Sequence, residues 1–176
     1  MPAQLPGPVC QILNGLSIDA GTLCRASSPA PAIDESSTPA LSTRAIVAAC
    51  EARWDANKGD CSGFVRAVAA DLGITIRGLA NDIVDQMASG PWVKVASGSD
   101  AKRQADLGRF VLGGLKAKGH GHVVVVVAGP LAKGQYPTAY WGRLGGEGRK
   151  ATTINWAWNA DDRDLVTYAY YGGSIR

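Results

Sequence analysis

Five consecutive valines, residues 123–127, constrain the fold of this chain more than any other feature of its sequence. β-Branched side chains favour extended backbone, and an apolar run without polar alternation is typical of a strand buried on both faces. The run is far shorter than the roughly 20 residues that a membrane-spanning helix requires. It therefore predicts a central strand of a sheet that is covered on each face.

The pattern of apolar residues changes from helical to extended along the chain. Four helices are predicted. The first follows Leu41, has Ser42 or Thr43 as its cap, and buries Ile46, Cys50 and Trp54. The second covers 64–72, with Cys61 in its first turn and Gly73 after its end, the third covers 80–88, and the fourth covers 98–107 and starts at Ser99 or Asp100. Strands are predicted over 110–115, 122–129, 138–142, 152–158 and 165–171. Helices followed by strands indicate an α+β domain in which the helices pack on an antiparallel sheet.

Composition divides the 176 residues into two parts. Residues 1–40 are rich in Pro, Ser and Ala and are expected to be a flexible tail and linker, whereas residues 41–176 form one domain. The N-terminus has no Lys or Arg before its apolar residues, so we expect no Sec signal peptide and synthesis in the cytoplasm. The net charge of +3 is scattered, so neither nucleic acid nor a membrane is expected as a partner.

The chemistry that can be inferred from the residues concerns Cys61 in NKGDCSGFV, between a turn and an apolar helical run. A helix N-terminus favours a thiolate and lowers its pKa, and the backbone N–H groups of Cys61 and Ser62 can face an oxyanion. A cysteine nucleophile needs a base, and the chain has two histidines, His120 and His122. We favour His122 because it begins the valine strand, whereas His120 lies between glycines.

Two other interpretations of these residues stay open. A metal-dependent hydrolase would use His120 and His122 with Cys61 or an acidic residue as ligands. A non-catalytic binding module would simply bury Cys61, as we expect for Cys50 on the apolar stripe of its helix. A disulfide between Cys10 and Cys24 is also left open.

Four strings in this order resemble the first family of type VI secretion amidase effectors, which belong to the NlpC-type papain-like cysteine peptidases. They are NKGDCSGFVRAVAADLGI, RGLANDIVD, GHVVVVVAGPL and DDRDLVTYAYY, and the similarity covers roughly residues 44–171. The resemblance implies a papain-like fold with N-terminal helices packed on a central antiparallel sheet. It also implies a catalytic Cys61 within CSGFV and a catalytic His122 within GHV, with no cofactor or metal.

The function implied by the resemblance is that of an antibacterial toxin. Such an enzyme is a DL-endopeptidase that cleaves the amide between γ-D-glutamate and meso-diaminopimelate in peptidoglycan stem peptides. The type VI system would deliver it, with a component of the secretion tube as a partner, into the periplasm of a rival cell. A periplasmic immunity protein would protect the producer. We expect the enzyme itself to be a monomer.

Several residues near the expected groove carry more specific predictions. Asp60 replaces the more familiar asparagine before the nucleophile and is expected to cap the helix. The third catalytic position matches Trp141, or Tyr140 if the strand slips by one, although an indole cannot accept a hydrogen bond from the imidazole. Asn81 and Asp82 are candidate substrate-binding residues. The side chains of Trp92, Trp156 and Trp158 are expected in the core.

Overall fold

The computed structural model describes residues 41–174. The predicted tail and linker over residues 1–40 lies outside them, as do Cys10 and Cys24. Within this part of the chain, no helix combines the length and the apolar character needed to cross a membrane.

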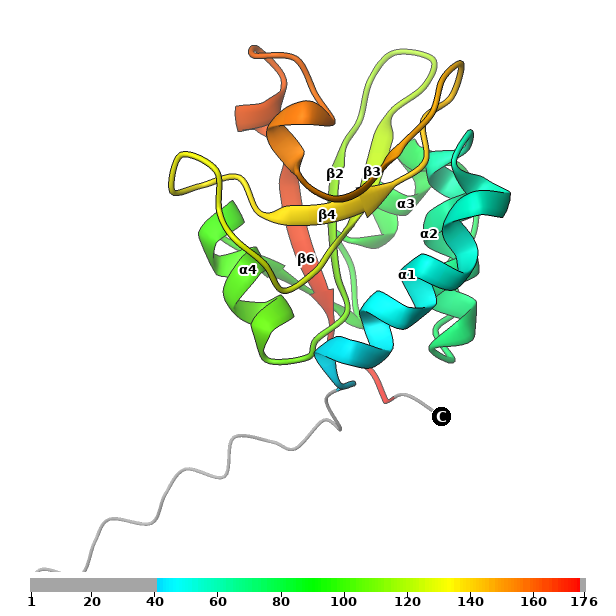
Figure 1. The fold of residues 1–176 in the computed structure, drawn as a ribbon, viewed down its shortest axis with the longest axis vertical. Coiled ribbons are helices and arrows are strands. Elements are labelled where there is room, and N and C mark those ends of the chain that lie inside the picture. Colours follow the sequence, from blue (N-terminus) through cyan, green and yellow to red (C-terminus); the bar gives the residue numbers. More distant parts are fainter. Residues whose placement is uncertain (1–40, 175–176) are drawn as a thin grey trace, which may run out of the picture. The chain divides into compact units, whose positions relative to one another are not determined.

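Within residues 41–174 the α-helices come before the strands, except that one short strand precedes the last α-helix (Figure 1). The elements are α1 (Thr43–Asn57), α2 (Cys61–Asp71), α3 (Ala80–Gln86), β1 (Trp92–Val95), α4 (Gly98–Asp106), β2 (Val111–Leu115), β3 (His122–Val126), β4 (Thr138–Trp141), β5 (Arg149–Thr153), the 3₁₀ helices η1 (Ile154–Trp156) and η2 (Arg163–Leu165), and β6 (Thr167–Tyr171). The α+β class predicted from the sequence is confirmed.

The sheet has six strands in the order β1-β6-β2-β3-β4-β5, and every neighbouring pair is antiparallel. Strand β3 lies in the interior of the sheet, between β2 and β4. Alternate valines of β3 enter two separate cores. Val123 and Val125 pack with α1, α2 and α3, whereas Val124 and Val126 pack on the opposite face, where α4 lies (Figure 1). The predicted double coverage is thereby confirmed, and burial of each valine contributes roughly 1.5–3 kcal/mol to folding.

The helix α1 illustrates how local signals set the boundaries of an element. Ser42 is its N-cap, and the Ser42 hydroxyl accepts a hydrogen bond of 3.1 Å from the Ala45 N–H. Ile46, Cys50 and Trp54 are buried along one stripe, as their spacing predicts. Cys50 is fully buried and free, which confirms its prediction as a small apolar core residue.

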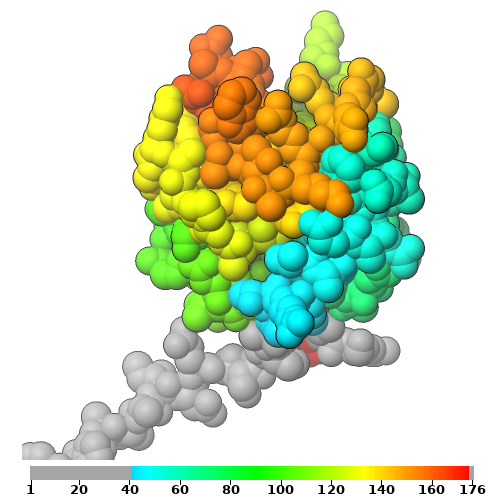
Figure 2. Space-filling model, viewed as in Figure 1, coloured from blue at the N-terminus to red at the C-terminus, as the bar shows by residue number. Residues whose placement is uncertain are grey.

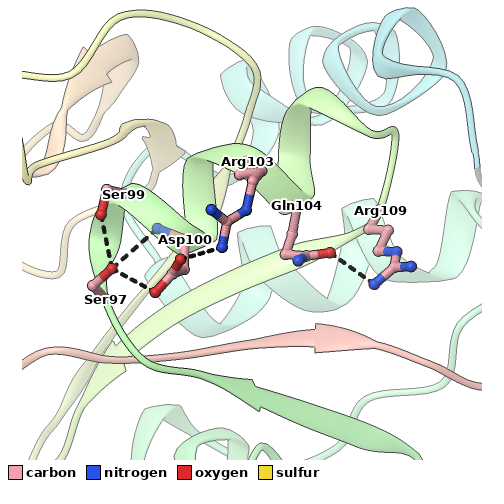
Figure 3. A network of polar contacts seen from close by, with 6 residues as sticks. All are labelled: Ser97, Ser99, Asp100, Arg103, Gln104 and Arg109. Atoms are coloured by element: carbon pink, nitrogen blue, oxygen red, sulfur yellow. Dashed lines mark hydrogen bonds and ion pairs between the residues drawn. The ribbon is translucent and has the colours of Figure 1, made fainter.

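A polar network within residues 97–109 caps α4 and joins its end to the segment before β2 (Figure 3). Ser97 is the N-cap, and its hydroxyl accepts from the Asp100 N–H at 3.1 Å and donates to the Asp100 carboxylate at 2.8 Å. Arg103 donates to the same carboxylate one turn later, and Arg109 donates to the Gln104 side chain at 2.7 Å. The predicted start at Ser99 or Asp100 is therefore wrong, because the earlier serine Ser97 satisfies the first turn.

The strand predictions need two further corrections. The short strand β1 was not predicted, because four residues with a mixed polar pattern give little periodic signal, and it forms by pairing with β6 at the sheet edge. The strand predicted over 152–158 is instead β5, which ends at Thr153 and continues as η1. Pairing with the β4 segment ends with the hydrogen bond from the Ile154 N–H to the Pro137 carbonyl, and the Ala157 N–H then bonds to the Ile154 carbonyl at 2.8 Å to form η1.

Candidate active site

The turn between α1 and α2 places Cys61 at the first position of a helix. The Asp60 N–H bonds to the Asn57 carbonyl at 2.9 Å, and the Phe64 N–H bonds to the Asp60 carbonyl at 2.9 Å, which starts α2. Asp60 occupies the N-cap position with extended backbone, but its carboxylate accepts no capping hydrogen bond. The predicted position of Asp60 is therefore right and its predicted capping bond is wrong.

The first N–H groups of α2 consequently receive no capping hydrogen bond from the Asp60 side chain. Within the described residues, the N–H groups of Cys61 and Ser62 donate to no oxygen atom, as expected of a helix N-terminus. Gly63 allows the Asp60 carboxylate to lie close by, since a Cβ at this position would come within 2.5 Å of Asp60 Oδ2. The compact turn thus leaves backbone donors beside the thiol.

The thiol of Cys61 is buried at the beginning of β3, with only 1% of the residue exposed. Pairing of β3 with β4 covers Val125 and Val126, and helix α2 packs against the same strand. In this position the backbone N–H of Val123, the residue that follows His122, lies near enough to the Cys61 sulfur to lower the pKa of the thiol. The fold therefore brings the predicted nucleophile to the strand start that carries the predicted base.

The pKa of the Cys61 thiol is raised, and burial is the main cause. Hydrogen bonds from the Val123 N–H, the Ser62 hydroxyl and the Ser62 N–H act in the opposite direction, and the negative charge of Asp60 raises the pKa further. The expectation of a lowered pKa from the helix N-terminus alone is therefore wrong, because desolvation of the thiolate outweighs its hydrogen bonds.

The imidazole of His122 is mostly buried, and its pKa is lowered from 6.5 to about 4. Burial is the largest cause, followed by the positive charges of Arg143 and His120. The ring lies edge-on to that of Trp158, with ring centres 5.0 Å apart and planes at 68°. At neutral pH the Cys61 thiol is therefore protonated and the His122 imidazole is neutral, which are the protonation states that a thiol nucleophile and its general base require before reaction.

The loop between β2 and β3, which ends at the histidines, is held by α3. The Asn81 amide donates to the Ala117 carbonyl at 3.0 Å, and the Ala117 N–H donates to Asn81 Oδ1 at 3.2 Å. Gly121 lies so close that a Cβ there would be 2.3 Å from Asn81 Oδ1. Asp82 accepts from the Leu79 N–H at 2.9 Å at the start of α3. Both residues thus have structural hydrogen bonds, and their role in substrate binding stays a prediction.

A second loop, residues 142–148 between β4 and β5, holds the turn before Cys61. The Lys58 carbonyl accepts hydrogen bonds from the Arg143 N–H at 2.9 Å and the Gly148 N–H at 2.8 Å. Gly142 is in such close contact that a Cβ there would lie 2.2 Å from the Asn57 carbonyl oxygen. Sequence reasoning missed this contact, although four glycines in seven residues indicated a close backbone approach.

The space-filling view shows the same arrangement on the surface (Figure 2). The orange surface that follows residue 145 lies beside the cyan surface of α1 and the turn after it. Two ion pairs join these segments, between Lys150 and Glu51 at 2.7 Å and between Lys58 and Glu147 at 3.4 Å. The turn before Cys61, residues 57–60, is therefore held in place by the loop between β4 and β5.

Within the described residues, neither residue proposed for the third catalytic position forms a side-chain hydrogen bond with His122. The Trp141 side chain is buried in the core on the α4 face, and its carbonyl accepts from Trp54 Nε1 at 3.3 Å. The Tyr140 hydroxyl donates to Glu51 at 2.7 Å. Nε2 of His122 is buried and has no hydrogen-bond partner among residues 41–174. In this part of the chain, the orientation of the ring rests on its contact with Trp158.

The tryptophans differ from their predicted positions in the core. Trp92 and Trp158 are half-buried and pack against the core. Trp156 is 59% exposed, and the Arg149 guanidinium stacks on its ring with 5.1 Å to the centre. The core prediction for Trp156 is wrong because η1 replaces the expected strand, so the alternation of faces does not extend to this residue.

Metal binding was the other chemistry considered for the two histidines. His120 is exposed, and its Nδ1 lies 2.8 Å from the Gly121 carbonyl oxygen. Over the described range, no three side chains of His, Cys, Asp or Glu converge in a way that would hold a metal ion.

Comparison with known proteins supplies the family. No protein-family model matches the chain. The chain is 40% identical over 137 residues to the peptidoglycan amidase Tse1 of Pseudomonas aeruginosa, an alignment that covers 72% of this chain and 88% of the relative. The chain therefore belongs to the type VI secretion amidase effector family.

Proposed function

We propose that this protein is a peptidoglycan amidase of the DL-endopeptidase type, which cleaves the amide between γ-D-glutamate and meso-diaminopimelate in stem peptides. The relative is named as a peptidoglycan amidase, and 88% of its length aligns with this chain. The observation that carries the proposal is the position of the buried Cys61 sulfur at the Val123 N–H, next to His122.

The proposed mechanism begins from a neutral pair. His122 accepts the thiol proton while the Cys61 sulfur attacks the γ-glutamyl carbonyl, and the backbone N–H groups of Cys61 and Ser62 stabilise the oxyanion. His122 then donates its proton to the leaving amine of diaminopimelate, which leaves a thioester on Cys61. Water hydrolyses the thioester with His122 as the base. The raised pKa of the thiol and the lowered pKa of the imidazole mean that proton transfer accompanies the attack.

The biological setting is proposed from membership in the family. The enzyme acts in the periplasm of a rival bacterium after delivery by the type VI system, in contact with a component of the secretion tube. An immunity protein in the periplasm of the producer blocks the site. Residues 1–40 serve as a delivery or regulatory segment, and residues 41–176 are the amidase domain.

Mass spectrometry of muropeptides tests the reaction and the nucleophile together. Purified wild-type protein, Cys61→Ala and the matched control Cys50→Ala are each incubated with muropeptides. We expect the wild type and Cys50→Ala to release products split between D-glutamate and diaminopimelate, and Cys61→Ala to release none. Circular dichroism establishes that each variant is folded. Cleavage by folded Cys61→Ala at the wild-type rate would exclude Cys61 as the nucleophile, and cleavage at another bond would exclude the proposed specificity.

A further inference from the structure

Arg143 is fixed next to the turn that carries the nucleophile. Strand β4 ends at Trp141, and Gly142 brings the backbone into contact with the carbonyl oxygens of Asn57 and Asp60. The next residue, Arg143, donates its N–H to the Lys58 carbonyl at 2.9 Å. Because these contacts determine where the Arg143 backbone lies, its side chain begins at a defined point beside the turn before Cys61.

The guanidinium of Arg143 differs from the other cations of this surface. Lys58 pairs with Glu147, and Lys150 pairs with Glu51. Arg143 is exposed, and within residues 41–174 its guanidinium forms no ion pair or hydrogen bond. Its charge also lowers the pKa of His122, and its backbone N–H is bound to the Lys58 carbonyl, so the cation belongs to the loop that contacts the turn before Cys61. An anion bound at this position would accept hydrogen bonds from the guanidinium and form an ion pair with it.

The substrate proposed above supplies a carboxylate at a suitable place. A γ-linked D-glutamyl residue keeps a free α-carboxylate, three carbon atoms from the scissile γ-carbonyl. The negative charge of Asp60 beside the thiol disfavours this anion, as shown by its effect on the pKa of Cys61. A cation near the same turn, such as the guanidinium of Arg143, offsets this repulsion and orients the substrate.

We propose that Arg143 binds the α-carboxylate of the γ-D-glutamyl residue and thereby directs the scissile carbonyl to Cys61. Arginine binds carboxylates through two parallel hydrogen bonds, which fix both position and orientation. Arg143 thus determines specificity for D-glutamate over its α-amide, D-isoglutamine. This inference rests on the proposed function, since it assumes that the γ-glutamyl bond is the one cleaved.

The test compares three stem tripeptides that contain γ-D-glutamyl-diaminopimelate. The first is unmodified, the second carries the α-amide on glutamate, and the third carries an amide on the side-chain carboxylate of diaminopimelate. Each is assayed for kcat/KM with the wild type, Arg143→Gln, Arg143→Lys and Arg44→Gln. Arg44 is an exposed arginine of α1, on the order of 20 Å along the helix from Asn57, and its substitution removes the same charge elsewhere.

We expect the wild type and Arg44→Gln to prefer the unmodified substrate over the glutamate α-amide by roughly 10- to 100-fold. Arg143→Gln should lose this preference by becoming slower on the unmodified substrate alone, and Arg143→Lys should keep part of it because a lysine retains the charge without the bidentate geometry. Amidation of diaminopimelate should affect all variants equally.

Other outcomes would overturn the inference. If Arg143→Gln kept the full preference for the unmodified substrate over the glutamate α-amide, another group would bind the α-carboxylate. If Arg143→Gln instead lost discrimination against the substrate with amidated diaminopimelate, Arg143 would bind the diaminopimelate carboxylate, on the other side of the scissile bond. An equal loss on all substrates would mean that Arg143 acts through His122, and the acid limb of the pH profile would then move upward. Failure of the wild type to cleave any of the three would instead refute the proposed function.

Discussion

Acidification should destabilise this protein through His122, and the size of the effect follows from its pKa. The value is about 4 in the folded protein and 6.5 for the unperturbed side chain. Between these values the unfolded state binds more protons than the folded state, so stability is lost as the pH falls from 6.5 through 4. The contribution of His122 amounts to a loss of about 2 kcal/mol at pH 5 and about 3 kcal/mol at pH 4.

Urea unfolding at pH 7.5, 6, 5 and 4 measures this loss. Wild type is compared with His122→Gln, which has no titrating ring, and with His120→Gln, which removes the exposed histidine. Carboxylate titration is common to all three proteins and cancels in the difference. We expect the gap between wild type and His122→Gln to change by about 3 kcal/mol over this range, in the direction that favours the variant at low pH. His120→Gln should follow the wild type closely.

NMR titration of the imidazole protons gives the decisive value. A pKa near 4 for His122 would establish the neutral resting pair. A pKa at or above 6.5 would refute the reasoning, because it would mean that a thiolate on Cys61 stabilises an imidazolium in the resting enzyme. The acid limb of kcat/KM would then lie near neutrality instead of near pH 4.

Further predictions concern the loops, the metal and the tail. Gly142→Ala should displace the turn before Cys61 and lower kcat/KM by roughly 100-fold. Gly146→Ala in the same loop, where a Cβ meets only Arg143 Cδ at 3.8 Å, should retain activity. Equal activities of the two variants in a steady-state assay would contradict the role of the contact between Gly142 and Asn57. Asn81→Ala should lower the free energy of unfolding by about 1–2 kcal/mol, because both hydrogen bonds to Ala117 are lost. An increase in KM without any loss of stability would instead support substrate binding by Asn81. Incubation with EDTA should leave muropeptide cleavage unchanged, and inactivation that zinc reverses would favour the metal-dependent alternative. Deletion of residues 1–40 should leave the rate of hydrolysis in vitro nearly unchanged, and a folded but inactive fragment would exclude a purely delivery role.

The contacts around Cys61 separate what is local in this protein from what is not. The start of α2 at Cys61, its end before Gly73 and the burial of the β3 valines were predicted from the sequence, because capping and periodicity depend on residues within a few positions of each other. The pKa of Cys61 could not be predicted in this way. Its direction depends on burial of the thiol beneath segments that come together only in the folded chain.

The same distinction applies to the residues that hold the site. A glycine at position 142 is visible in the sequence, but its contact with Asn57 requires that β4 and the end of α1 meet. Likewise, Trp156 alternates with Trp158 as in a strand, yet the hydrogen bond from the Ala157 N–H to the Ile154 carbonyl closes a 3₁₀ turn in which Trp156 is exposed. The sequence by itself therefore determined most of the elements and predicted which groups are reactive. Only the tertiary structure decided their protonation and their supporting contacts, because both depend on the distances between segments that are remote in the chain.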